Sequence, residues 1–190
     1  YTLTDEARRD VALVNGRREL YHGSPNFTQL CFSRPEVRAK LVNFLVGYAE
    51  RKPYIDFLHV WLSDAAGNQC ECEECRKFHP SELYVRLLNE LDEALTARGI
   101  DMRIVFIMYT DTRWAPVIER FRHSERFVFT TAFSRSYSTP YARPDTLPPL
   151  PEWERNRTRD SSSLALTLRF YEEWRRVFDG PAFVFEYYFY

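Results

Sequence analysis

Apolar residues follow two different spacings in this chain, and the two spacings alternate. Short runs of consecutive apolar residues, such as residues 104–109, are separated by longer segments in which apolar residues recur every three or four positions, such as residues 83–95. The first pattern is typical of strands buried on both faces, and the second of helices with one buried face. Strands that alternate with helices pair in parallel, because each connection crosses back over the sheet. The sequence therefore predicts an α/β fold built on a parallel sheet.

Local signals indicate where the expected elements begin and end. Ser33 and Glu36 match a capping box, in which each side chain binds the backbone N–H of the other, so a helix is expected to start there. Gly99 stands where a left-handed residue would end the second long helix. Residues 1–27 are expected to form a lead-in with a small hairpin at Asn15-Gly16. The expected helices cover residues 33–50, 80–98, 114–121 and 161–178, and the expected strands cover residues 29–32, 55–62, 102–109, 127–131 and 182–190.

Five strands and four helices fit either a partial (β/α)8 barrel of the TIM type or an open doubly wound sheet. A dinucleotide-binding doubly wound sheet carries a glycine-rich G-x-G-x-x-G turn, whereas this chain has only 6 glycines and no such motif. The partial barrel is therefore favoured. Because the last expected strand runs to Tyr190, we expect residues 1–190 to form a single incomplete barrel domain, a fragment of a longer protein. Its open sheet edge could pair with a second copy of the chain.

The charge balance argues against polyanionic partners. The chain has 26 Lys and Arg against 27 Asp and Glu, a net charge of −1, so it lacks the basic surface that binds nucleic acid. No stretch approaches the roughly 18 to 20 consecutive apolar residues that span a bilayer, and no membrane partner is expected. The sequence does not indicate a cellular location.

Three of the 4 cysteines lie close together in a C-x-C-x-x-C segment, at Cys70, Cys72 and Cys75. This spacing lets three thiolates converge on one ion. A tetrahedral zinc would need a fourth ligand, for which Cys31 is the first choice, since it ends the preceding expected strand, and His79 the second. Four sulfurs would make a closed, structural zinc site. The cysteines could instead form disulfides in an exported protein, or remain free thiols.

Three carboxylates lie at the ends of expected strands, where the active sites of parallel barrels gather. Enzymes that cleave glycosidic bonds commonly use two carboxyl groups on opposite sides of the bond. Asp64 and Glu186 are the expected catalytic pair, because Asp64 precedes small residues that leave it accessible and Glu186 lies inside an apolar run. Asp111 is expected to bind substrate, unless it caps the helix expected at Trp114.

Aromatic and polar side chains near the same strand ends are expected to bind a sugar. Flat aromatic faces suit sugar rings, although each ring could equally belong to the core. The expected substrate-binding residues are Trp61, Asn68, Tyr109, Asp111, Arg135 and Tyr187.

The segment from Trp61 to Cys75 (WLSDAAGNQCECEEC), with YVRLLNE at 84–90, resembles the DUF4838 family, an uncharacterised group associated with bacterial carbohydrate-active proteins. CFSRPEV at 31–37 and EYY at 186–188 are similar to its other recurring stretches, so the resemblance covers most of the chain from about residue 28. It implies a glycosidase-type barrel, distantly like α-glucuronidase and hexosaminidase barrels, and supplies no catalytic residues.

The sequence as a whole predicts a glycoside hydrolase with a carbohydrate substrate. The alternative is a carbohydrate-binding barrel module of a larger protein, without catalysis. Fold resemblance alone does not choose between the two, because barrels host many chemistries.

Overall fold

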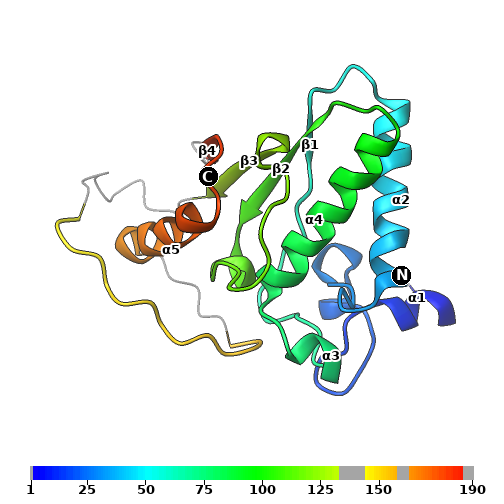
Figure 1. Ribbon diagram of the computed structural model, residues 1–190. Helices are drawn as coiled ribbons and strands as arrows, with labels where there is room; N and C mark the ends of the chain where they lie inside the picture. Colours follow the sequence, from blue (N-terminus) through cyan, green and yellow to red (C-terminus); the bar gives the residue numbers. More distant parts are fainter. Residues whose placement is uncertain (1, 133–143, 158–162, 186–190) are drawn as a thin grey trace.

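One parallel sheet forms the centre of the molecule. The computed structural model describes residues 2–132, 144–157 and 163–185 (Figure 1), and these contain a four-stranded sheet in the order β1-β2-β3-β4. All three pairs of neighbouring strands are parallel, which confirms the predicted α/β fold with a parallel sheet. A complete barrel is not present in these residues. The strands are β1 (Phe57–His59), β2 (Arg103–Met108), β3 (Phe127–Ala132) and β4 (Ala182–Phe185).

Helices connect and flank the strands, as Figure 1 shows. α4 lies between β1 and β2 in the chain, and α5 lies between β3 and β4, while α2 packs along α4. Gly99, with a left-handed φ of 66°, follows α4 and confirms the predicted helix end. The helices are α1 (Asp5–Asp10), α2 (Pro35–Arg51), α3 (Glu73–Arg76), α4 (Pro80–Ala97) and α5 (Leu164–Val177).

One face of the sheet and the helices share a dense aromatic and aliphatic core. The rings of Phe106 in β2 and Phe129 in β3 stack with centroids 5.1 Å apart. Trp174 of α5 lies over both, at 5.6 and 5.7 Å. Such aromatic contacts contribute about 0.5–1.5 kcal/mol each beyond the apolar area that they bury. The same buried cluster contains Leu87, Leu88, Leu91 and Leu95 of α4, Ile104 and Met108 of β2, and Phe127, Phe170 and Phe178.

The opposite face carries aromatic rings from the two outer strands, and these rings meet. His59 of β1 lies 6.4 Å from Phe183 of β4, and Trp61, just after β1, lies 5.4 Å from Phe185. Neighbouring strands are about 4.8 Å apart, so in a flat sheet the backbones of β1 and β4 would be about 14 Å apart. Because strand side chains stand roughly perpendicular to the sheet, the ring contacts indicate that the sheet curls toward this face.

The strand predicted at residues 29–32 is wrong. Within it, only Leu30 pairs with another segment, in an isolated antiparallel bridge to Val11. Cys31 and Phe32 are buried, but the chain turns there before α2 begins. A short buried run has the same apolar pattern whether it lies in a strand or in a packed loop.

The helix predicted at residues 114–121 is also wrong, and a buried carboxylate explains why. Glu82 of α4 accepts hydrogen bonds from the backbone N–H groups of Val117 (2.5 Å), Ile118 (2.9 Å) and Glu119 (2.7 Å). These three donors face a side chain from another helix instead of carbonyls of their own turn. The connection from β2 to β3 therefore wraps around Glu82 and forms no α-helix.

The lead-in differs in detail from the prediction for residues 1–27. The expected hairpin is reduced to one tight turn, in which Val14 and Arg17 pair across Asn15 and Gly16. Both turn residues have left-handed φ values, 50° and 75°, as a two-residue turn of this kind requires. The short helix α1 was not predicted from the sequence.

Candidate metal centre and strand-end pocket

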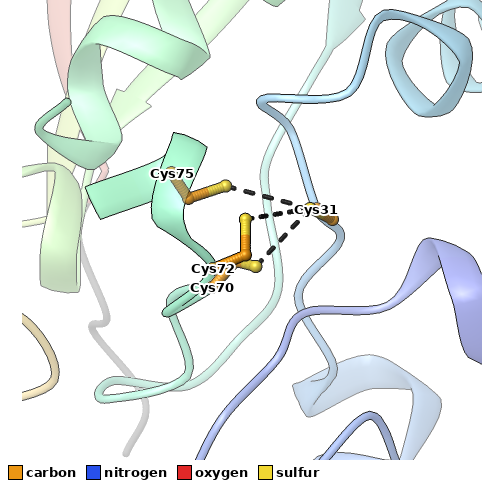
Figure 2. A group of neighbouring side chains, drawn as sticks. All are labelled: Cys31, Cys70, Cys72 and Cys75. Atoms are coloured by element: carbon orange, nitrogen blue, oxygen red, sulfur yellow. Dashed lines mark hydrogen bonds between the residues drawn. The ribbon is translucent and has the colours of Figure 1, made fainter. Parts of the chain in front are cut away.

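All four cysteines meet in one cluster (Figure 2). The Cys31 Sγ lies 3.5 Å from that of Cys70, 3.7 Å from that of Cys72 and 3.9 Å from that of Cys75. All four sulfurs lie within 4.8 Å of one another, and none of the cysteines is in a disulfide. Four cysteines so placed could hold a metal ion. The prediction that Cys31 joins the C-x-C-x-x-C segment is confirmed.

Local structure brings these cysteines together from distant parts of the chain. Cys70 and Cys72 lie in the loop after β1. Cys75 lies in the single turn of α3, and its sulfur points toward Cys31. Cys31 lies in the turn before α2, opposite them. The backbone N–H of Leu13 points at the Cys70 Sγ, 3.3 Å away. Cys31, Cys70 and Cys75 are buried, and Cys72 is half-buried.

Ser33 lies at this cluster and does not cap a helix. The residue before the first turn of α2 is Arg34, and no side chain caps the helix there, so the predicted capping box of Ser33 and Glu36 is wrong. The Cys75 thiol donates to the Ser33 Oγ over 3.0 Å, and the same oxygen lies 3.7 Å from the Cys72 Sγ. A hydroxyl two residues after Cys31 was the signal in the sequence for this role.

The thiols share their protons unequally. The pKa of the Cys31 thiol is held below its ordinary value, because the Cys70 and Cys75 thiols hydrogen-bond to its sulfur. The pKa values of Cys70 and Cys75 are raised, first by their bonds to Cys31. The thiolate form is therefore favoured at Cys31 over Cys70 and Cys75. An Arg18 guanidinium nitrogen lies 4.0 Å from that sulfur and supplies a nearby positive charge.

His79, the second choice for a fourth ligand, lies outside the cluster. Its ring stacks against Trp153 with centroids 4.5 Å apart. Burial lowers the pKa of His79, which keeps the imidazole neutral at physiological pH.

A pocket of about 180 Å³ lies at the carboxyl ends of β1, β2 and β3. Asp64 and Trp61 from the loop after β1 line it together with Tyr109, which follows β2. The Tyr109 hydroxyl donates to the Asp64 Oδ1 over 3.1 Å. The other carboxylate oxygen of Asp64 has no hydrogen-bond partner among the described residues, and it can therefore act on a ligand. The remaining lining residues are Gln29, Leu62, Ser63, Gln69, Tyr84, Ile107, Thr110, Thr112 and Ala132.

Asn68 and Asp111 hold the loop after β1 and do not line this pocket. The Asn68 Nδ2 donates to the Phe27 carbonyl and to the Ser63 hydroxyl, both at 2.7 Å. The Asp111 Oδ2 accepts from the Gly67 N–H at 2.9 Å and from the Gln69 side-chain amide at 3.4 Å. Both side chains are buried, so in this structure they stabilise the loop that lines the pocket and are not part of its lining.

Asp111 also does not cap a helix at Trp114. It lies within a short 3₁₀ turn, Thr110–Thr112, and residues 114–121 are not helical. Three residues singled out in the sequence, Arg135, Glu186 and Tyr187, lie outside the described residues.

The chain matches no known family model, no curated protein and no solved structure at a significant level. The resemblance to the DUF4838 family therefore stays a prediction. Among the described helices, none has the length and apolar character needed to cross a bilayer.

Proposed function

We propose that the chain is the sugar-binding and catalytic part of a glycoside hydrolase, with Asp64 as one of two catalytic carboxyl groups. The observation that carries the proposal is the placement of Asp64 in a strand-end pocket, fixed by the Tyr109 hydroxyl and beside the Trp61 ring. An oriented carboxylate next to an aromatic face is what a sugar ring requires: the ring packs on the indole, and the carboxylate reaches the glycosidic bond.

Glu186 is the proposed second carboxyl group. It directly follows β4, whose last residue, Phe185, lies 5.4 Å from Trp61. One of the two groups would protonate the leaving oxygen, and the other would act as nucleophile or as base toward water. A carboxyl separation of about 5 Å would retain the anomeric configuration, and one of about 6.5–9.5 Å would invert it. Tyr109 would orient the carboxylate, and Arg135 and Tyr187 are proposed to bind the substrate.

The experiment is a turnover assay of the protein on a panel of 4-nitrophenyl glycosides and bacterial polysaccharides. Asp64→Asn and Glu186→Gln should each reduce turnover roughly 100-fold or more, the size of a lost acid or base. Glu152→Gln, an exposed change away from the pocket, is the control. Wild-type turnover in both carboxylate variants would show that the assignment is wrong.

A second candidate is a carbohydrate-binding module without catalysis. Among the described residues that line the pocket, Asp64 is the only carboxylate, which favours binding if no second one approaches. Glycan binding by calorimetry, unchanged in Asp64→Asn and with no product released from any glycan in the panel, would select this candidate.

We propose that the cysteine cluster holds a structural zinc ion. Zinc–sulfur bonds of about 2.3 Å in a tetrahedron place sulfurs about 3.8 Å apart, close to the distances of 3.5, 3.7 and 3.9 Å from Cys31. A disulfide would bring only two sulfurs together and leave the others aside, whereas here one sulfur is near three. Four thiolates leave no open position for water, so the ion would brace the loop that carries Asp64 and take no part in the reaction.

Elemental analysis and a melt with a chelator test the zinc site. We expect bound zinc and a lower Tm after chelation, because binding free energy adds to folding free energy. Protein without metal, with a Tm that does not respond to the chelator, would exclude the site.

The curled parallel sheet supports a partial (β/α)8 barrel, which we propose as the architecture. Contacts between rings of β1 and β4 are expected in a barrel, because its strands surround a core of inward-facing side chains. In the described residues each of these strands is paired on one side only. We also propose that these open edges allow self-association with a second copy of the chain.

A further inference from the structure

The segment that follows β3 reaches back to the cysteine loop through one arginine. The Arg155 guanidinium donates to three backbone carbonyls: those of Cys70 (3.0 Å), Cys75 (2.7 Å) and Phe78 (2.6 Å). The Cζ atom of the guanidinium also lies 5.0 Å from the centre of the Trp153 ring. The planar fork of the guanidinium presents its N–H donors in fixed directions, so one side chain serves all three acceptors.

The next residue, Asn156, binds the same loop in a two-way pair. Its Oδ1 accepts from the Gln69 N–H at 2.7 Å, and its Nδ2 donates to the Gln69 carbonyl at 2.9 Å. The Nδ2 also donates to the Glu71 carboxylate at 2.8 Å. Asn156 has a left-handed φ of 59°, a conformation that asparagine tolerates better than most residues. The strained backbone is thus compensated by three hydrogen bonds.

Two of these hydrogen bonds are made to the backbone of residues that would hold the metal, Cys70 and Cys75. Arg155 fixes the carbonyl of Cys70 and that of Cys75, so it determines how the two sulfurs are presented. A divalent ion with four thiolates carries a formal charge of −2. Arg18, beside the Cys31 sulfur, and Arg155 together supply two positive charges that offset it. Burying a guanidinium costs much less free energy beside such a negatively charged centre than without an opposite charge nearby.

We infer that Arg155 and Asn156 are positioning residues of the metal centre, so that metal binding and the docking of residues 144–157 stabilise each other. The inference rests on the proposed metal site and adds the coupling to it. Coupling is reciprocal: a clamp that favours the metal-bound loop is itself favoured by the metal. Since the same loop carries Asp64, the ion would also help to hold that carboxylate at the strand-end pocket.

The affinity for zinc, measured by competition with a chromophoric chelator, tests this coupling. Arg155→Ala should bind zinc roughly 10- to 100-fold more weakly than the wild type, the usual effect of removing a group that orients metal ligands. Arg155→Lys should give a smaller loss than Arg155→Ala, since lysine keeps the positive charge but lacks the planar fork that reaches the three carbonyls. The matched control is Arg157→Ala, an exposed arginine that pairs only with Glu154 at 3.0 Å among the described residues, and it should bind zinc as the wild type does.

Proteolysis supplies a readout independent of affinity. A glutamate-specific protease cleaves after Glu152, and the Glu152–Trp153 bond is the same in all these variants. Zinc should slow cleavage there in the wild type and in Arg157→Ala, and chelation should abolish that protection. In Arg155→Ala, cleavage should be fast with or without zinc. A purely structural role would instead lower the Tm of the zinc-free and zinc-bound forms equally and leave zinc affinity unchanged.

Two results would overturn the coupling. Equal zinc affinity in Arg155→Ala and Arg157→Ala would show that the coupling does not exist, and the proposed metal site would be unaffected. A wild type that binds no zinc would disprove both the coupling and the metal site. If Arg155→Ala does not fold, Asn156→Ala replaces it, because it deletes the pair to Gln69 and the bond to Glu71 without touching Arg155. It too should bind zinc more weakly than Arg157→Ala.

Discussion

The Tyr109 hydroxyl donates a hydrogen bond of 3.1 Å to the Asp64 carboxylate and so joins the loop after β1 to the end of β2. Tyr109→Phe removes this bond and leaves the ring in place. Turnover should fall about two- to tenfold, since a net hydrogen bond contributes about 0.5–1.5 kcal/mol. Tyr54→Phe, at an exposed tyrosine far from the pocket lining, should have no effect. Equal losses in both variants would show that Tyr109 has no specific role in the pocket.

Cys31 is the sulfur that all the others approach, so its replacement should empty the metal centre. Cys31→Ser should contain little zinc after purification and should have a lower Tm that no longer responds to a chelator. Ser33→Ala removes a neighbouring hydroxyl that is hydrogen-bonded to the Cys75 thiol and should keep its zinc. Elemental analysis of the two proteins makes the comparison. Zinc retained in Cys31→Ser would point to another ligand.

Glu82 should matter for stability although it lies far along the chain from the segment it organises. Glu82→Gln turns one acceptor oxygen into an NH₂ group that faces backbone donors, so at least one of these N–H groups loses its partner. The free energy of unfolding should fall by about 1–3 kcal/mol. Urea denaturation checks this, with Glu125→Gln, at an exposed glutamate, as the control. A value within error of that control would show that the turn does not depend on the carboxylate.

His123 should make stability depend on pH. The ring donates from its Nδ1–H to the buried Asp92 carboxylate over 2.7 Å, and this bond raises the pKa of His123 in the folded protein. A raised folded pKa means that the stabilisation is fully present below the unfolded value of about 6.5 and is lost as pH rises through the folded value. Thermal melts from pH 5.5 to about 8.5 should show a decline in this range that is smaller in His123→Gln. An identical decline in the variant would refute the assignment.

The outer strands should support self-association. Phe57 on β1 and Phe183 on β4 are 45% and 40% exposed, and both strands have an unpaired edge in the described sheet. Phe183→Lys should shift any concentration-dependent association to roughly tenfold higher protein concentration, because a lysine on an edge strand opposes pairing with another strand. Phe44→Lys changes a ring on α2 that is 64% exposed and should not have this effect. Sedimentation velocity over a range of concentrations measures both.

The elements with strong local signals could be predicted from the sequence. α4 has leucines at helical spacing and a glycine after its end, and β2 and β3 are short segments rich in apolar residues, so their positions are correct to within a residue or two. The convergence of Cys31 with the C-x-C-x-x-C segment could also be predicted, although for a wrong reason. Cys31 was assigned to a strand beside β1, but it lies in a turn that packs against the loop.

The failures share a physical cause, which is control by a group distant in sequence. Residues 114–121 have a helical pattern, but Glu82 binds their N–H groups. Ser33 has a helix-capping pattern, but the Cys75 thiol occupies its hydroxyl. The role of Arg155 has no local pattern at all, because its acceptors lie some 80 residues earlier in the chain. Spacing rules describe neighbours in sequence and do not reach such contacts.

The Arg155 clamp recognises carbonyl oxygens only, and every amino acid provides one. Substitutions at positions such as Glu73, Glu74 or Phe78 can therefore accumulate over evolutionary time without weakening it, provided that the main chain keeps its path. The side chains of the cysteine loop that face solvent can change while the Arg155 hydrogen bonds to its main chain stay the same. Homologues would accordingly be expected to share the arginine and the four sulfurs more faithfully than the residues between them.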